Sequence, residues 1–133
     1  MITSNGKSIV VVDDELDIVN QIKRSLGAMD GLKVYTFTDP FAALEYFNSG
    51  CKDHHDLVIS DIRMPGMNGY EFVKKVKKIH PQVKIILMSS FERDDNNLLL
   101  DVSSDVKIDT FLQKPFSLDI LTNLVSIHQD IKN

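Results

Sequence analysis

The 133-residue chain has one cysteine and lacks long apolar runs. Cys51 alone cannot form an internal disulfide, and no cysteines and histidines have the spacing of a zinc site. The longest apolar runs, residues 9–12 and 85–88, fall far short of the ~18 residues of a membrane span. Residues 1–7 are polar and lack the apolar core of a signal peptide. These absences predict a cytoplasmic protein without a membrane segment.

The chain also lacks an excess of basic residues. Its 15 lysines and arginines face 19 acids, so the formal net charge is −4. A mildly acidic chain is poorly suited to neutralise phosphates, so we expect no direct binding of nucleic acid. Fifteen of the acids are aspartates, a residue that favours helix caps, turns and metal sites. The positions of the aspartates therefore become the main question.

Short apolar runs alternate with helically spaced apolar residues five times along the chain. Strands are expected at 8–12, 33–38, 56–60, 83–88 and 110–113. Helices are expected at about 15–28, 40–48, 72–79 and 92–103, and again after a cap at Ser117. Alternating βα units predict one α/β domain over residues 1–133, a doubly wound parallel sheet with helices on both faces. Two strand orders are common for such sheets, and both bind ligands beyond the carboxyl ends of the strands.

Five residues whose side chains can react or bind ligands fall at these carboxyl ends. Asp13 and Asp14 follow the first strand, Asp61 the third, Ser89 the fourth and Lys114 the fifth. Three carboxylates brought together repel one another unless a cation neutralises them, and Mg²⁺ suits such ligands. A divalent cation, an ammonium group and a hydroxyl donor favour phosphoryl transfer, with a carboxylate as nucleophile.

The order and spacing of these residues resemble those of a response-regulator receiver domain of two-component signalling, over essentially the whole chain. The resemblance rests on Asp13-Asp14, the loop 61–65 with Gly69, Ser89 and Lys114-Pro115. It implies a flavodoxin-like (βα)5 fold with strand order 2-1-3-4-5. It also implies a signalling switch that catalyses only its own phosphorylation and dephosphorylation, and so is no enzyme in the usual sense.

The resemblance assigns the metal and phosphoryl roles by position. Asp61 would be the phosphoacceptor, and it would bind Mg²⁺ together with Asp14 and the backbone carbonyl of Arg63, while Asp13 would assist through water. Lys114 would hold a phosphoryl oxygen.

Further roles in the family concern the switch and the partners. Ser89 and Phe111 would move together on phosphorylation, and the bond between Lys114 and Pro115 would be cis. A sensor histidine kinase or a small acyl phosphate would supply the phosphoryl group. The fourth helix, fifth strand and fifth helix would form the output face, which would control a partner protein or an effector domain, with a homodimer also possible. Because the chain ends just after the last helix, it could be a stand-alone receiver or part of a longer regulator.

The chain departs from the family pattern between its fourth and fifth strands. Ser89 replaces the commoner Thr, and Phe111 replaces the commoner Tyr. The stretch between Ser89 and Lys114 is long and lacks a Gly-Ala pair, so the helix at 92–103 is weakly marked. Within it, Leu98 and Leu100 cannot both face one apolar stripe, so either the helix is broadly buried or one leucine contacts a partner.

Three other readings stay open. A Mg²⁺-dependent phosphatase with an aspartyl-phosphate intermediate would need a second aspartate two residues after Asp61, where Arg63 stands. A flavodoxin-like cofactor protein would need a phosphate loop after the first strand, where Asp13, Asp14 and Glu15 stand. A pseudo-receiver would fold without being phosphorylated.

Other polar residues have structural readings. The run Lys74, Lys75, Lys77 and Lys78 is expected to form a solvated helix face. The pair His54-His55 is expected on the surface, and Cys51 is read as an incidental thiol.

The residues two positions after Asp61 and Ser89 generate a kinetic prediction. Arg63 and Phe91 are both large and would flank the phosphoryl group, so we expect them to restrict attacking water. The combined substitutions Arg63→Ala and Phe91→Ala should shorten the phosphoryl lifetime, measured as loss of the phosphorylated mass over time. An unchanged lifetime would refute this prediction.

Overall fold

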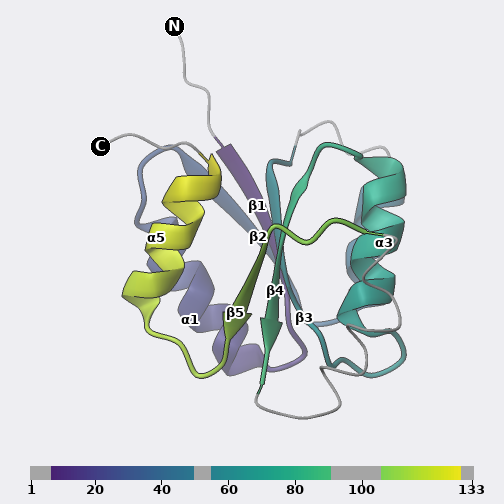
Figure 1. The fold of residues 1–133 in the computed structure, drawn as a ribbon, viewed down its shortest axis with the longest axis horizontal. Helices are drawn as coiled ribbons and strands as arrows, with labels where there is room; N and C mark the ends of the chain where they lie inside the picture. The colour runs from purple at the N-terminus through teal and green to yellow at the C-terminus, as the bar shows by residue number, and fades with distance from the viewer. Residues whose placement is uncertain (1–6, 50–54, 91–105, 130–133) are drawn as a thin grey trace, which may run out of the picture.

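The computed structural model describes residues 7–49, 55–90 and 106–129, which form a parallel sheet covered on both faces by helices (Figure 1). The strands are β1 (Lys7–Val12), β2 (Leu32–Phe37), β3 (Leu57–Asp61), β4 (Lys84–Ser89) and β5 (Thr110–Gln113). The helices are α1 (Leu16–Gly27), α2 (Pro40–Asn48), α3 (Gly69–Ile79) and α5 (Leu118–Gln129). The strand order is β2-β1-β3-β4-β5, which confirms the predicted flavodoxin-like fold. The helix predicted at 92–103, with its leucines at 98–100, lies outside the described residues.

The central strands are apolar on both faces because each face packs against helices. Val10 and Val12 join the core beneath α2 and α3, whereas Ile9 and Val11 join the core beneath α1 and α5. All four side chains are fully buried, and burial of each contributes roughly 1.5–3 kcal/mol. This two-sided burial explains why the strand shows no alternation of apolar and polar residues.

Helix starts are set by side chains that cap free backbone N–H groups. The Asp39 carboxylate accepts the N–H of Phe41 at 3.0 Å, and Pro40 takes the first helical position of α2. The Ser117 hydroxyl accepts the N–H of Ile120 at 3.1 Å, as predicted for α5. These caps stabilise their helices by about 1 kcal/mol each and fix where the preceding loops end.

The helix α3 begins with a reciprocal cap that sequence reasoning did not predict. The Asn68 side chain accepts the N–H of Glu71, and the Glu71 carboxylate accepts the N–H of Asn68. Beyond this cap the helix separates its two faces as expected. Its buried side includes Phe72, Val73 and Val76. Of the four lysines, 75 and 78 are exposed and 74 and 77 are half-buried.

The carboxyl ends of all strands lie at one edge of the sheet, at the bottom of Figure 1. From β1 the chain passes first to β2 on one side and then to β3 on the other. The order therefore reverses between β1 and β3, and the loops after these strands diverge to opposite faces. This is the place where doubly wound sheets bind ligands. None of the described helices is long and apolar enough to cross a membrane.

His55 corrects the prediction of a surface histidine. Its side chain is 1% exposed, and its two ring nitrogens are hydrogen-bonded to the Ser8 hydroxyl at 2.7 Å and the Tyr46 hydroxyl at 2.8 Å. The rings of Tyr35 and Phe47 pack around it, with centroids 5.1 and 5.5 Å away. The imidazole can be buried because both nitrogens have partners. His54 and Cys51 lie outside the described residues.

Replacing His55 should therefore reduce stability. We expect His55→Ala to lower the free energy of unfolding by about 2–4 kcal/mol, because it removes a packed ring and two buried hydrogen bonds. His55→Phe should lower it less, since the ring volume is kept. Urea unfolding measures both, with the exposed Lys75→Ala as the control. A His55→Ala variant as stable as this control would contradict the buried role.

Candidate functional site

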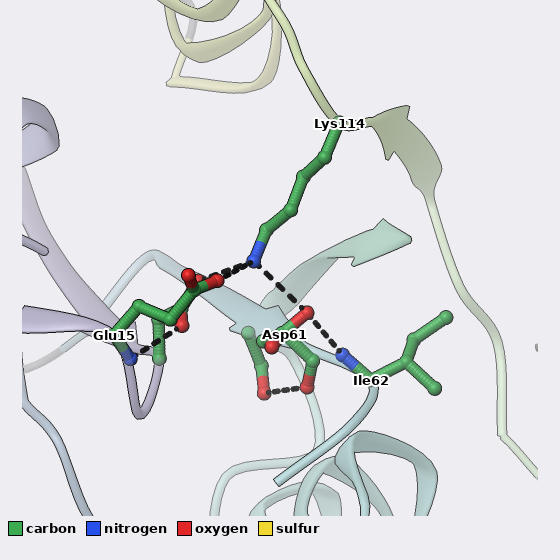
Figure 2. Close-up of polar contacts among 6 residues, drawn as sticks. Glu15, Asp61, Ile62 and Lys114 are labelled. Atoms are coloured by element: carbon green, nitrogen blue, oxygen red, sulfur yellow. Dashed lines mark hydrogen bonds and ion pairs between the residues drawn. The ribbon is translucent and has the colours of Figure 1, made fainter. Parts of the chain in front are cut away.

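Three charged side chains meet at the edge where the strand order reverses. Asp13 follows β1, Asp61 ends β3, and Lys114 follows β5. The Lys114 ammonium nitrogen lies 2.8 Å from Asp13 Oδ2 and 3.3 Å from Asp61 Oδ1. Figure 2 shows the lysine reaching from the end of β5 toward Asp61. Residues separated by 101 positions in the chain thus form one site, as the strand-end positions predict.

Asp61 is held by the turn that follows β3. Its Oδ1 accepts the backbone N–H of Ile62 at 3.0 Å (Figure 2), and the N–H of Gly69 donates to the Ile62 carbonyl at 2.7 Å. A Cβ atom at position 69 would collide with the backbone carbonyl oxygen of Asp61. This close approach is the physical reason for a glycine eight residues after the aspartate.

Three aspartates supply oxygens that a metal ion could share. One carboxylate oxygen each of Asp13, Asp14 and Asp61 lies within 4.8 Å of the others. Asp13 is buried and its Oδ1 accepts the N–H of Glu15 at 2.9 Å, whereas Asp14 is exposed. A set of carboxylate oxygens that is open to solvent on one side fits Mg²⁺, which keeps part of its water shell.

Burial and mutual repulsion set the protonation of the site. Burial, and then the charge of Asp13, raise the pKa of Asp61 from its ordinary value of 3.8 to about 6. Burial likewise raises the pKa of Asp13. Burial alone would lower the pKa of Lys114, but the hydrogen bond and charge of Asp13, together with Asp61, outweigh it and raise the pKa. The Asp61 carboxylate is therefore mostly ionised at neutral pH, beside a protonated lysine.

The other predicted site residues lie near this cluster. Ser89 ends β4, and its backbone carbonyl accepts the N–H of Lys114 at 2.7 Å, so the two residues are neighbours. Phe111 lies on β5 and is 42% exposed. The movements of Ser89 and Phe111 remain predictions.

The flanking positions are only partly described. The Arg63 side chain is exposed in the loop after β3, and the use of its carbonyl as a ligand stays a prediction. Phe91 lies outside the described residues. The peptide bond between Lys114 and Pro115 is cis, as predicted.

Glu15 belongs to the site and was not assigned to it by sequence reasoning. Its Oε1 lies 3.3 Å from the Lys114 nitrogen (Figure 2). The only signal was a third acid directly after the Asp13-Asp14 pair, and this reads equally well as an exposed residue at a helix start.

Comparisons with known proteins agree with this geometry. The family model described as response regulator receiver domain matches residues 9–126. Over 115 residues the chain is 34% identical to the DNA-binding transcriptional regulator NtrC of Escherichia coli (strain K12), covering 86% of this chain and 23% of that protein. Over 131 residues it is 25% identical to sporulation initiation phosphotransferase F of Bacillus subtilis (strain 168), covering 96% of this chain and 98% of that protein.

A solved structure extends the comparison to three dimensions. The chain is similar to the crystal structure of a response regulator receiver domain protein from Clostridium thermocellum, with a TM-score of 0.78 and 28% identity. The similarity covers 93% of this chain and 94% of that one. The chain spans less than a quarter of NtrC but nearly all of the Bacillus subtilis relative.

The raised pKa of Asp61 predicts a pH-dependent effect on stability. The folded state binds a proton at Asp61 more tightly than the unfolded state, so ionisation of Asp61 destabilises the fold. This destabilisation is fully present above pH 6 and absent below pH 3.8. Asp61→Asn should therefore raise the free energy of unfolding at pH 7.5 by on the order of 1–3 kcal/mol. The gain should shrink as the pH falls toward 4.

Denaturant unfolding at several pH values, without divalent cations, measures this gain. The matched control is Asp30→Asn, which changes an exposed aspartate of a turn. A gain from Asp61→Asn that is equal at pH 4.5 and pH 7.5 would show that burial of the charge is not its cause.

Proposed function

The chain belongs to the family of response regulator receiver domains, and we propose that it is a phosphorylation-activated switch in which Asp61 accepts the phosphoryl group. The observation that carries the proposal is the Lys114 ammonium between the Asp13 and Asp61 carboxylates at the carboxyl edge of the sheet. It supports the proposal because an ionised nucleophile and a fixed positive charge are what an incoming phosphoryl group requires.

The proposed reaction is a displacement at phosphorus. A carboxylate oxygen of Asp61 forms a new bond to the phosphorus of a phosphohistidine on a histidine kinase, or of a small acyl phosphate. The bond from phosphorus to the donor nitrogen or oxygen breaks, and its electron pair leaves with the donor. Asp61 needs no base because its pKa of about 6 leaves it ionised at neutral pH. Lys114 then donates to a phosphoryl oxygen and offsets its negative charge.

The same residues would hold the metal. The close carboxylate oxygens of Asp13, Asp14 and Asp61 support a Mg²⁺ site, with the backbone carbonyl of Arg63 as a further ligand. When bound, Mg²⁺ would neutralise charge on the phosphoryl oxygens. Asp13 would also keep Lys114 in place through its 2.8 Å contact.

The proposed output involves the surface near β5. Ser89 would turn toward the phosphoryl group, and Phe111 would follow, which would alter the face formed by the fourth helix, β5 and α5. Added negative charge at Asp61 would shift an existing equilibrium between two conformations. The partner would be a downstream protein, an effector domain or a second copy of the chain. The assignment of residues 1–133 as a single receiver domain and the cytoplasmic location also belong to this proposal.

Phosphorylation can be tested with a small acyl phosphate. Incubation with acetyl phosphate and Mg²⁺ should add one phosphoryl group to the chain, measured by intact mass. Removal of Mg²⁺ should abolish this gain in mass, because the metal is part of the site. The substitution Asp61→Asn should also abolish it, because it removes the nucleophile. The matched control Asp30→Asn should be phosphorylated like the wild type.

This experiment and an assay of phosphate release from phosphate monoesters separate two alternatives. No gain with any donor would indicate a pseudo-receiver and overturn the proposal. Sustained release of phosphate from phosphate monoesters would instead indicate a phosphatase.

A further inference from the structure

The Lys114 ammonium is surrounded by three carboxylates. An ammonium group has three N–H donors and no acceptor. Its nitrogen lies 2.8 Å from Asp13 Oδ2, 3.3 Å from Glu15 Oε1 and 3.3 Å from Asp61 Oδ1. The lysine donates hydrogen bonds to Asp13 and Glu15 and forms an ion pair with Asp61. A phosphoryl oxygen that approaches Lys114 therefore competes with these carboxylates for the ammonium group.

The three partners differ in burial. The side chain of Asp13 is 0% exposed and that of Asp61 is 10% exposed, whereas that of Glu15 is 62% exposed. Separating Lys114 from Asp13 leaves a buried charge without compensation, which is strongly unfavourable. The same holds for Asp61 until its carboxylate forms the bond to phosphorus. Separating Lys114 from Glu15 returns that carboxylate to water, where ion pairs contribute little. Glu15 is therefore the contact that can be exchanged while the phosphoryl group approaches and Asp61 is still ionised.

The backbone of Glu15 is held by hydrogen bonds at the start of α1, whereas its side chain takes no part in capping that helix. Glu15 is the N-cap residue of α1, its N–H donates to Asp13, and its carbonyl accepts from Ile18 and Val19. Its side chain makes no capping hydrogen bond. It extends across the edge of the sheet to Lys114, 99 residues away in the chain (Figure 2).

We propose that Glu15 is a positioning residue that holds Lys114 in the unphosphorylated protein and releases it to an incoming phosphoryl oxygen. This inference rests on the proposed function of Asp61. Glu15 competes with the phosphoryl group for one donor of the lysine. It therefore slows phosphorylation of Asp61 without contacting the reacting atoms.

The substitution Glu15→Gln tests this competition. It keeps the length of the side chain and removes its charge, so the rate constant for phosphorylation by acetyl phosphate with Mg²⁺ should rise by about two- to fivefold. The increase should shrink at high ionic strength, because the pair is exposed to solvent. Intact mass over time gives both rates.

The matched control is Asp17→Asn. Asp17 is an exposed acid in the first turn of α1, and it forms no ion pair with Lys114 among the described residues. This variant loses the same charge close by, and its rate should stay near that of the wild type. Equal acceleration by both variants would overturn the inference in favour of a general charge effect on the anionic donor.

A second measurement does not depend on phosphorylation. In a double-mutant cycle, Glu15→Gln is introduced into the wild type and into the Lys114→Met variant, and the melting temperatures of all four proteins are measured. The substitution should raise the melting temperature more in the Lys114→Met background than in the wild type. The reason is that without the lysine it only relieves repulsion among the carboxylates, whereas in the wild type it also removes an attraction. Equal changes in both backgrounds would overturn the pairing.

The outcomes also separate the two proposals. If the wild type takes no phosphoryl group, the proposed function fails and the inference fails with it. If the wild type is phosphorylated and Glu15→Gln reacts at the same rate, only the inference fails.

Discussion

The ion pairs of Lys114 with two buried carboxylates are the interaction on which the site depends. Asp13 and Asp61 lie at the ends of adjacent strands, where burial raises both pKa values and the charge of Asp13 raises that of Asp61 further. A cation has to be present for both to remain ionised near neutral pH. Lys114 reaches them from β5, and the one strand between β5 and β3 in the sheet is β4. The lysine therefore connects the end of β5 to the ends of β1 and β3, with which β5 forms no backbone pairing.

This cluster opposes folding, so the rest of the domain has to hold it in place. Two apolar layers, one on each face of the sheet, supply the burial that fixes the strand ends. Locally, the turn after β3 closes through the Gly69 N–H, in a space that only a glycine fits. A destabilising site on a stable, two-sided core is a common arrangement for functional residues.

The strands, most of the helices and most of the site could be predicted from the sequence because they depend on local features, whereas the strand order rested on the resemblance to receiver domains. Apolar runs locate the strands, and a residue directly after a strand lies at the edge of the sheet wherever its partners are. That is why Asp13, Asp61 and Lys114 could be placed together. His55 and Glu15 could not, because neither directly follows the carboxyl end of a strand, and their partners lie up to 47 and 99 residues away. In the sequence, a histidine that bonds distant hydroxyl groups in the core looks the same as a surface histidine. A glutamate that pairs with a distant lysine likewise looks the same as a surface glutamate.

The geometry also bears on how a signal would leave the site. The Lys114 N–H donates to the Ser89 carbonyl, which ties the ends of β4 and β5 directly to the residue that would bind the phosphoryl group. Phe111 lies three residues earlier on β5 and is already half exposed in this conformation. A change of partner at the Lys114 side chain therefore acts on a short stretch of backbone next to the surface. In the proposed switch, a phosphoryl oxygen replaces Glu15 as a partner of Lys114, which changes the charge next to the end of β5. Asp13 keeps its ion pair with Lys114 throughout. The transition would therefore need little energy beyond that of phosphorylation itself.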